Sequence, residues 1–395
     1  MISQRIKNLA PSATLLMSQK SAELKAAGVD VINMSVGEPD FNTPDFIKEA
    51  AKKAIDENFS RYSPVPGYLS LREAICRKLE RENSLKYDPS QIVVGNGAKQ
   101  ELANVFLSLV NPGDEVIIPT PAWVSYVELV KLAEGKAVLL PAGLENDFKI
   151  TPEQLRGAIT DKTKMLLLNS PCNPTGSVYS KEELKALAEV LKEFPQIYVM
   201  SDEIYEHINF GVGTASIADF DWMKDRTVII NGVSKAYAMT GWRVGYMAGP
   251  ADIAKACTKL QGQYTSGCSS IAQKAAEAAY EGPQDCVEDM RVAFERRRDL
   301  IVSLAKDIEG WKVNVPQGAF YLFPDVTSFI GKKYKDYEIK NSGDYVLYLL
   351  QEAHVACVDG EAFCAPGYMR LSYATSDDNI REAMRRIKEA SQKLK

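Results

Sequence analysis

Short apolar runs alternate with amphipathic segments between about residues 70 and 250. One segment begins with a capping box, in which Ser180 and Glu183 satisfy the first amides of a helix that runs toward Phe194. Strands that are apolar throughout are buried on both faces, and helices between them are the usual crossovers of a parallel sheet. We therefore expect an α/β fold with a mainly parallel sheet between layers of helices. The predicted strands are 91–94, 115–118, 164–168, 197–200, 227–230 and 244–247.

Polar clusters follow four of these predicted strands. They are Asn96–Lys99, Asn173–Gly176, Asp202–Tyr205 and the segment around Lys235. Ligands of such sheets collect beyond the carboxyl ends of the strands. We expect all four clusters to face one crevice.

The C-terminal part has a different pattern. Residues from about 283 to 308 form one long, charged segment that predicts a helix bridging to a smaller lobe, and we interpret its basic run, Glu295–Arg298, as a solvated helix face. A chain of 395 residues also exceeds the size at which single cores stop growing. We predict three regions: an N-terminal arm with part of the small domain over 1–45, a large cofactor-binding domain over 46–285, and a small C-terminal domain over 286–395.

The composition is that of an ordinary globular protein, with 46% hydrophobic and 25% charged residues. A net charge of −5 and a pI near 5.5 argue against nucleic acid or an anionic membrane as a partner. No apolar stretch approaches the ~18 residues of a membrane-spanning helix. The start lacks the apolar core of a secretory signal, and the seven cysteines are scattered without a C-x-x-C pair. We expect a cytoplasmic protein with reduced thiols and, with only two histidines, no metal site built from three of them.

Lys235 is the most informative candidate residue. It follows an apolar run and lies in a glycine-containing segment, with Arg243 eight residues later. Burial lowers the pKa of a lysine toward the neutral amine that forms an imine with an aldehyde cofactor. Arg243 and the nearby glycines supply donors for a phosphate. The pairing suggests pyridoxal 5'-phosphate; the alternative is a solvated Lys235 beside an Arg243 that forms a structural ion pair.

Three further side chains suit the ring of that cofactor. A carboxylate such as Asp202 keeps a pyridine nitrogen protonated, which makes the ring an electron sink, although a helix N-cap is the alternative. Asn173 and Tyr205 can both hydrogen-bond a phenolic oxygen. The segment Asn173–Gly176 is also composed like a plain turn.

Weaker signals complete the candidate site. Trp123 could stack on the ring, although most tryptophans lie in cores. Gly97–Lys99 opens a predicted helix, whose free amides favour a phosphate. Arg370 lies in a strand-like run and offers the planar fork that an α-carboxylate requires, while a surface arginine is the alternative.

The order and spacing of these motifs resemble the class I aminotransferases of fold type I over essentially the whole chain. Within that family the chain is most similar to the prokaryotic-type aspartate aminotransferases, including the branch that also uses prephenate. The motifs that carry the resemblance are Gly37–Pro44, the Asn173 turn, Ser201–Tyr205, the Lys235 segment and Arg370–Ala374.

The resemblance implies a large domain with a mainly parallel sheet, a smaller α+β domain, and a homodimer with shared active sites. It implies that Lys235, Asp202 and Tyr205 are catalytic. The implied cofactor contacts are Lys235, Asp202, Asn173, Tyr205, Trp123, Arg243, Gly97, Ala98, Lys99 and, toward the neighbouring subunit, Tyr62. The implied substrate contacts are Gly37, Trp123, Asn173, Arg370, Lys99 and Thr14.

One position departs from many relatives. They carry a phosphate-binding hydroxyl three residues before the lysine, where this chain has Gly232. We do not assign that role to Ser234, so the replacement for this phosphate contact stays open.

Taken with the resemblance, the residues predict a transaminase that converts L-aspartate and 2-oxoglutarate to oxaloacetate and L-glutamate, with prephenate as a further candidate acceptor. The alternatives are another pyridoxal-phosphate enzyme, such as a β-lyase or an aromatic aminotransferase, and a cofactor-binding regulator without turnover. A dinucleotide oxidoreductase is disfavoured because no G-x-G-x-x-G follows a strand.

Overall fold

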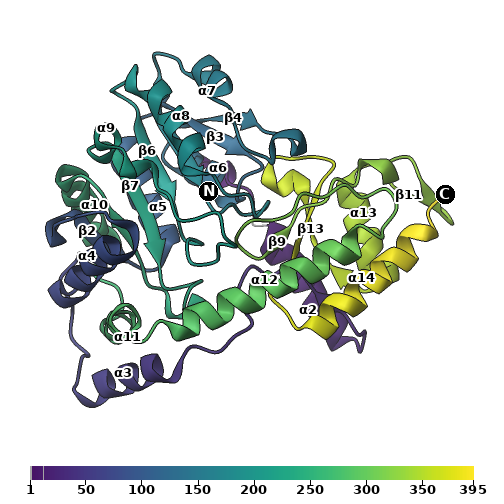
Figure 1. The fold of residues 1–395 in the computed structure, drawn as a ribbon, viewed down its shortest axis with the longest axis horizontal. Helices are drawn as coiled ribbons and strands as arrows, with labels where there is room; N and C mark the ends of the chain where they lie inside the picture. The colour runs from purple at the N-terminus through teal and green to yellow at the C-terminus, as the bar shows by residue number, and fades with distance from the viewer. Residues whose placement is uncertain (1, 12) are drawn as a thin grey trace.

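The computed structural model describes residues 2–11 and 13–395, without the side chains of residues 13–15. A seven-stranded sheet forms the larger half of the molecule, in the order β2-β8-β7-β6-β5-β3-β4 (Figure 1). Every neighbouring pair is parallel except those of β8, which runs antiparallel to both β2 and β7. The strands are β2 (Ile92–Gly95), β3 (Glu115–Thr120), β4 (Lys136–Pro141), β5 (Thr163–Asn169), β6 (Tyr198–Asp202), β7 (Thr227–Gly232) and β8 (Gly245–Ala248).

Helices cover both faces of this sheet, as the apolar strands predict. Side chains alternate between the faces, so Leu167 packs in the core beneath α5, α6 and α10, whereas Leu166 and Leu168 pack in the core beneath α7 and α8. The helices of this half are α3 (Asp45–Asp56), α4 (Leu69–Asn83), α5 (Ala98–Leu109), α6 (Ser125–Leu132), α7 (Pro152–Ala158), α8 (Lys181–Lys192), α9 (Asp221–Lys224), α10 (Ala251–Tyr264) and α11 (Ser270–Glu281). The predicted capping box at Ser180 is confirmed at the start of α8.

The second half of the molecule is built from segments near both ends of the described chain. Strand β1 (Ile32–Asn33) pairs with β12 (Val355–Ala356), and a three-stranded antiparallel sheet has the order β13-β14-β9. Its other elements are β9 (Tyr321–Leu322), β10 (Lys333–Tyr334), β11 (Tyr337–Glu338), β13 (Val358–Asp359), β14 (Met369–Ser372), α2 (Ala13–Ala26), α13 (Ser342–Tyr348) and α14 (Asp377–Gln392). Helix α1 (Gln4–Lys7) instead contacts the large lobe, where Arg5 pairs with Glu134 at 3.2 Å. We call the half with the seven-stranded sheet the large lobe and this half the small lobe; domain boundaries at residues 45 and 285 stay a prediction.

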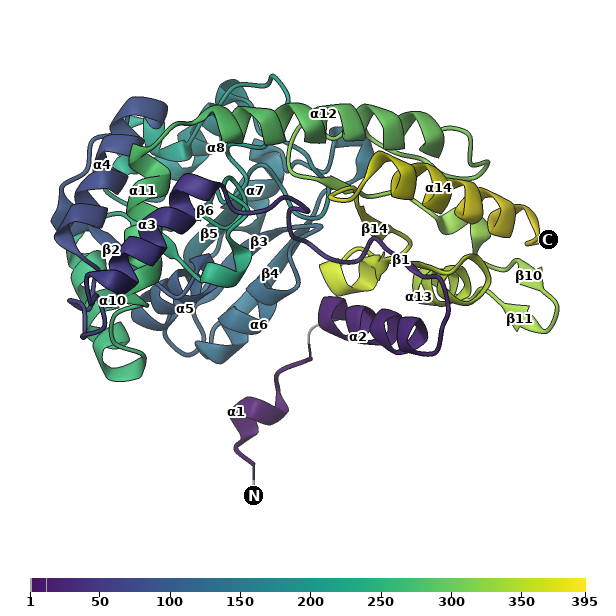
Figure 2. The same ribbon diagram turned by 90° about the horizontal axis from the view of Figure 1, so that it is seen from below.

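Helix α12 (Asp285–Ala305) runs from the large lobe along the small lobe, where α14 packs beside it (Figures 1 and 2). The prediction of a long bridging helix is confirmed, but the interpretation of its basic run as a solvated face is wrong for Arg297 and for Arg298, whose side chain is 11% exposed. Arg297 is 7% exposed, and its guanidinium makes two hydrogen bonds with the Asp40 carboxylate at 2.7 and 3.0 Å. Arg297 faces the segment between β1 and α3 while the adjacent Arg296 is exposed, because successive helix residues face different directions. None of the helices in the described part is both long and apolar enough to cross a bilayer.

Candidate active site

A cavity of about 390 Å³ lies between the two lobes, beyond the carboxyl ends of β5, β6 and β7. The four polar clusters that the sequence placed after strands all contribute to its wall, because parallel strands end at the same edge of a sheet. Ten of the sequence-predicted site residues line it: Gly37, Ala98, Lys99, Trp123, Asn173, Asp202, Tyr205, Lys235, Arg243 and Arg370.

Lys235 follows β7 and projects its amine into the cavity. Its Nζ donates to the carbonyl oxygen of Gly37 at 2.6 Å and lies 5.7 Å from the centre of the Tyr205 ring. Burial lowers the pKa of Lys235 to about 8, and the positive charges of Arg370 and Arg243 act in the same direction. The amine is therefore far closer to its neutral, nucleophilic form at neutral pH than a solvated lysine would be. A solvated surface lysine does not describe it.

Asp202 ends β6 at the floor of the cavity. Tyr126 donates a hydrogen bond of 2.7 Å to its Oδ2, and the amide of Ile204 donates to Oδ1 at 3.2 Å. No helix begins here in the described chain, so the N-cap interpretation is wrong. Burial raises the pKa of Asp202 to about 6, and the hydrogen bond from Tyr126 opposes that rise. A buried carboxylate with this much cost of ionisation is suited to a cationic partner.

Arg370 on β14 is 1% exposed, so it is not a surface strand arginine. Its guanidinium donates to the side-chain oxygen of Asn173 at 2.9 Å and to the carbonyl of Ser35 at 2.7 Å, and it stacks over the ring of Tyr321 at 4.5 Å. Its Nε has no hydrogen-bond partner within the described residues. These contacts hold the Arg370 guanidinium in one orientation. The N–H group that has no partner indicates that an anion could bind here.

Tyr205 follows the same strand as Asp202. Its hydroxyl pairs with the hydroxyl of Tyr321 at 2.7 Å, and both rings are buried. Asn173 lies in the turn after β5, whose backbone closes through the amide of Gly176 and the carbonyl of Cys172 at 2.9 Å. The turn interpretation and the placement of the Asn173 side chain in the cavity are therefore both correct.

Arg243 and Gly97 lie together at one end of the cavity. A Cβ built on Gly97 would lie 2.5 Å from the Arg243 guanidinium, and Ala98 then begins α5, so an arginine and a helix N-terminus converge there. Gly232 stands against β8, where a Cβ would lie 2.7 Å from Gly245 Cα and 2.8 Å from the Val244 carbonyl. The absence of a hydroxyl at position 232 thus has a steric reason, and the nearby Ser234, which we left out, lines the cavity instead.

Lys99 and Trp123 lie at the mouth of the cavity. The Lys99 ammonium is 4.6 Å from the centre of the Trp123 ring, which is a cation–π distance. Partial burial lowers the pKa of Lys99, and the charge of Arg243 lowers it further. Both effects favour an anion near this amine.

Of the other three predicted site residues, Gly97 lies beside Arg243 without lining the cavity itself. Tyr62 is 97% exposed and does not line it. Thr14 lies in α2, and its side chain is outside the described part of the chain.

Two tyrosines of the cavity were not predicted from the sequence. Tyr126 on α6 and Tyr321 on β9 stand in apolar surroundings and read as core residues, which both are by burial. Their hydroxyls nevertheless reach Asp202 and Tyr205. The feature that could have indicated them is the hydroxyl group, because a buried tyrosine hydroxyl usually has a hydrogen-bond partner.

A lysine and a buried carboxylate at the carboxyl edge of an α/β sheet, facing a buried arginine of the small lobe across a cavity, define a small-molecule enzyme site rather than a structural module. The family model for class I and II aminotransferases matches residues 29–387, and the chain belongs to that family. The chain is 48% identical over 396 residues to a protein of Cereibacter sphaeroides named aspartate/prephenate aminotransferase, covering 98% of this chain and 97% of that protein. It is 50% identical over 391 residues to the aspartate aminotransferase of Geobacillus stearothermophilus, covering 98% of each. A crystal structure of the aspartate aminotransferase from Rhizobium meliloti superposes with a TM-score of 0.97 at 42% identity, covering 100% of both chains.

Proposed function

We propose that this protein is a cytoplasmic, pyridoxal 5'-phosphate-dependent transaminase that converts L-aspartate and 2-oxoglutarate to oxaloacetate and L-glutamate. The proposal extends to prephenate as an amino acceptor. The observation that carries it is the convergence of Lys235, Asp202 and Arg370 on one cavity in a chain of the aminotransferase family.

The residues present fit the cofactor. Arg243 and the start of α5 form a cradle for a phosphate at the end of the cavity where Gly97 leaves room. The Asp202 carboxylate would hold the ring nitrogen in its protonated form, and Trp123 would cover the ring face. Asn173 and Tyr205 would contact the phenolic oxygen. When bound, this cofactor supplies an electron sink that stabilises negative charge at the substrate α-carbon.

Lys235 and Arg370 would have different roles in the reaction. The Lys235 amine would hold the cofactor through its aldehyde group, and it would serve as the base that accepts the proton from the substrate α-carbon, for which its lowered pKa is suited. Arg370 holds the α-carboxylate with its planar fork beside Gly37 and Asn173. A substrate held in this way would have its α-carbon within reach of one base while its carboxylate stays fixed.

The homodimer is part of the proposal because of Tyr62. A tyrosine that is 97% exposed and outside its own cavity is free to reach the phosphate of a neighbouring subunit. The active sites would then be shared between two copies of the chain.

One assay tests the reaction. The purified protein with added pyridoxal 5'-phosphate is given a panel of amino donors and the acceptors 2-oxoglutarate, oxaloacetate and prephenate, and the amino acid products are quantified. Transfer from aspartate to 2-oxoglutarate at the highest kcat/KM is the expected result. Release of pyruvate and ammonia from β-substituted amino acids without transfer would identify a β-lyase, and cofactor binding without any turnover would identify a regulator.

The second carboxylate of aspartate is assigned to Lys99 together with Thr14. A flexible ammonium at the mouth of the cavity can meet distal carboxylates of different reach as a point charge. Because hydrogen bonds to charged groups contribute ~1.5–3 kcal/mol, Lys99→Ala is expected to lower kcat/KM for aspartate roughly 10- to 150-fold. Monocarboxylic amino acids, which still meet Arg370, should change far less.

Lys192→Ala is the matched control for Lys99→Ala. The Lys192 ammonium also lies 4.6 Å over a tryptophan ring, that of Trp222, but on α8 and away from the cavity. It should leave every rate unchanged. An equal loss for both substrate classes, or a collapse of cofactor affinity, would instead assign Lys99 to the phosphate.

A further inference from the structure

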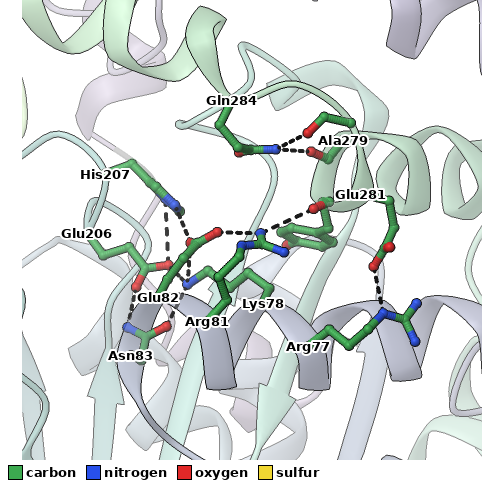
Figure 3. Close-up of polar contacts among 12 residues, drawn as sticks. Arg77, Lys78, Arg81, Glu82, Asn83, Glu206, His207, Ala279, Glu281 and Gln284 are labelled. Carbon is green, nitrogen blue, oxygen red and sulfur yellow. Dashed lines mark hydrogen bonds and ion pairs between the residues drawn. The ribbon is translucent and has the colours of Figure 1, made fainter.

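A buried lysine lies outside the candidate active-site cavity. Lys78 on α4 is 0% exposed. Its ammonium donates to the Glu206 carboxylate and to the Asn83 side-chain oxygen, the latter at 2.9 Å (Figure 3). Burying an ammonium is costly unless it is paired and hydrogen-bonded. The presence of a buried ion pair at this place therefore needs a reason, and the proposed reaction does not supply one.

Glu206 is the centre of this group. Its Oε2 accepts from the Asn83 amide at 2.8 Å, and its Oε1 accepts from the Asn231 amide at 2.7 Å. Burial pushes the pKa of Glu206 upward, but the charges of Lys78 and His207 and the hydrogen bonds from Lys78 and Asn83 together hold that pKa below its usual value. The carboxylate therefore stays ionised and accepts strong hydrogen bonds.

The two ends of this network lead to two groups that face the cofactor site. Glu206 directly follows Tyr205 in the chain. The Asn231 side-chain oxygen accepts from the amide of Gly232 at 2.7 Å, at the end of β7, three residues before Lys235. One buried carboxylate thus bonds the turn that carries Tyr205 to the strand end that carries Lys235.

We propose that Glu206 is a positioning residue that fixes Tyr205 relative to Lys235 through its hydrogen bond with Asn231, with Lys78 paired to its carboxylate. This inference rests on the proposed function, because the alignment matters only if both groups act on one cofactor. Asn83 holds the same carboxylate from the side of α4 and does not connect it to the cavity.

A metal site is the other chemistry that these side chains suggest. Glu82, Glu206 and His207 are of ligating types and lie together. The Lys78 ammonium already bonds Glu206 and lies 3.5 Å from Glu82, so it supplies the positive charge that a metal ion would bring. A positioning role agrees with this charge balance.

Asn231→Ala and Asn83→Ala separate positioning from stability. Each removes one amide that donates to Glu206 and one acceptor, so the hydrogen bonds lost are matched in number. Asn231→Ser serves as a second variant with a smaller polar side chain that cannot reach Glu206. The measurements are the melting temperature of the cofactor-free protein, the pH midpoint of the absorbance change of the lysine-bound cofactor, and kcat and KM for the amino donor.

Both alanine variants should lower the melting temperature by similar amounts. Only the variants at Asn231 should raise the absorbance midpoint, by about 0.5 to 1 pH unit. The Tyr205 hydroxyl would donate a hydrogen bond to the phenolic oxygen of the cofactor, which favours loss of the neighbouring imine proton. A displaced Tyr205 would weaken that hydrogen bond, so the imine would keep its proton to a higher pH. They should also lower kcat about 3- to 10-fold with KM changed less than about 2-fold. Asn83→Ala should leave midpoint and kcat as in the wild type.

Equal midpoints and equal kcat values in the Asn231 and Asn83 variants would overturn the positioning role while leaving the proposed function intact. A wild-type protein that binds no cofactor, or shows no pH-dependent absorbance, would instead refute the proposed function and this inference with it. The wild-type titration therefore tells the two failures apart.

Discussion

Replacing Tyr126 with phenylalanine would remove one hydrogen bond from the cavity floor and little else. The Tyr126 hydroxyl donates to Asp202 Oδ2 at 2.7 Å, and both groups are buried. The ring itself packs edge-on against Trp123, a contact that phenylalanine keeps. Any change in the variant therefore reports on how strongly Tyr126 stabilises the ionised form of Asp202.

The size of the effect follows from the carboxylate's charge. A hydrogen bond to a charged group contributes ~1.5–3 kcal/mol, which corresponds to about 1–2 pKa units. The pKa of Asp202, about 6 in the wild-type protein, should then rise to about 7–8. At pH 7 the ionised fraction would fall from about nine-tenths to between about one-half and one-tenth.

The sign of the pH dependence is defined by burial. The folded pKa of Asp202 lies above its ordinary value of 3.8, so the folded state binds more protons between those values. The stability that Asp202 contributes is full below about pH 4 and is lost as pH rises through about 6, by about 3 kcal/mol in all. In Tyr126→Phe the loss should continue to about pH 7–8.

Two measurements check this expectation: the melting temperature of the cofactor-free protein from pH 4 to 9, and the affinity for pyridoxal 5'-phosphate over the same range. The ratio of variant to wild-type affinity should be near one at high pH, fall about tenfold per pH unit between the new pKa and about 6, and level off below that. Tyr246→Phe is the control, since the Tyr246 hydroxyl is buried without a hydrogen-bond partner among the described residues. An affinity ratio independent of pH would refute the reasoning.

Two further predictions concern the subunits and the lobes. A heterodimer of one Tyr62→Ala chain and one Lys235→Ala chain should recover roughly half of the wild-type turnover if active sites are shared, because one of its two sites is then intact; purified heterodimers with no more activity than either parent would refute sharing. Arg297→Met should destabilise the protein by about 1–3 kcal/mol and lower kcat, because Asp40 loses its partner and Gly37, three residues earlier, accepts from Lys235. Thermal melts and steady-state rates measure this against Arg296→Met, an exposed neighbour that should leave both nearly unchanged.

Six of the seven strands of the large sheet could be predicted because they are buried on both faces. The seventh strand shows where this kind of prediction fails. Strand β4 (Lys136–Pro141) is a half-exposed edge strand, so its sequence lacks the continuous apolar run of its neighbours. The reversed direction of β8 was also missed. Its signal was the connection 233–244, which contains no long helix, whereas parallel neighbours need a crossover that usually includes one.

The same contrast holds in the candidate site. Lys235, Asp202 and Arg370 could be identified because charged residues in apolar runs are rare and demand a partner. Tyr126 and Tyr321 could not, because their rings satisfy the apolar pattern and only the fold decides what a hydroxyl reaches. Arg297 was misjudged for a related reason: three adjacent arginines look alike in sequence but point in different directions on a helix.

The pairing of β1 with β12 also determines how late in synthesis the small lobe can fold. Ile32 must wait for Val355, and the carbonyl of Met34 for the amide of Ser372, whereas the strands of the large sheet all lie between residues 92 and 248. A nascent chain can therefore assemble that sheet first, while its N-terminal apolar residues remain without partners. The cavity that joins Lys235 to Arg370 closes last, so until the final strands leave the ribosome Ile32 and Met34 are exposed sites for chaperones.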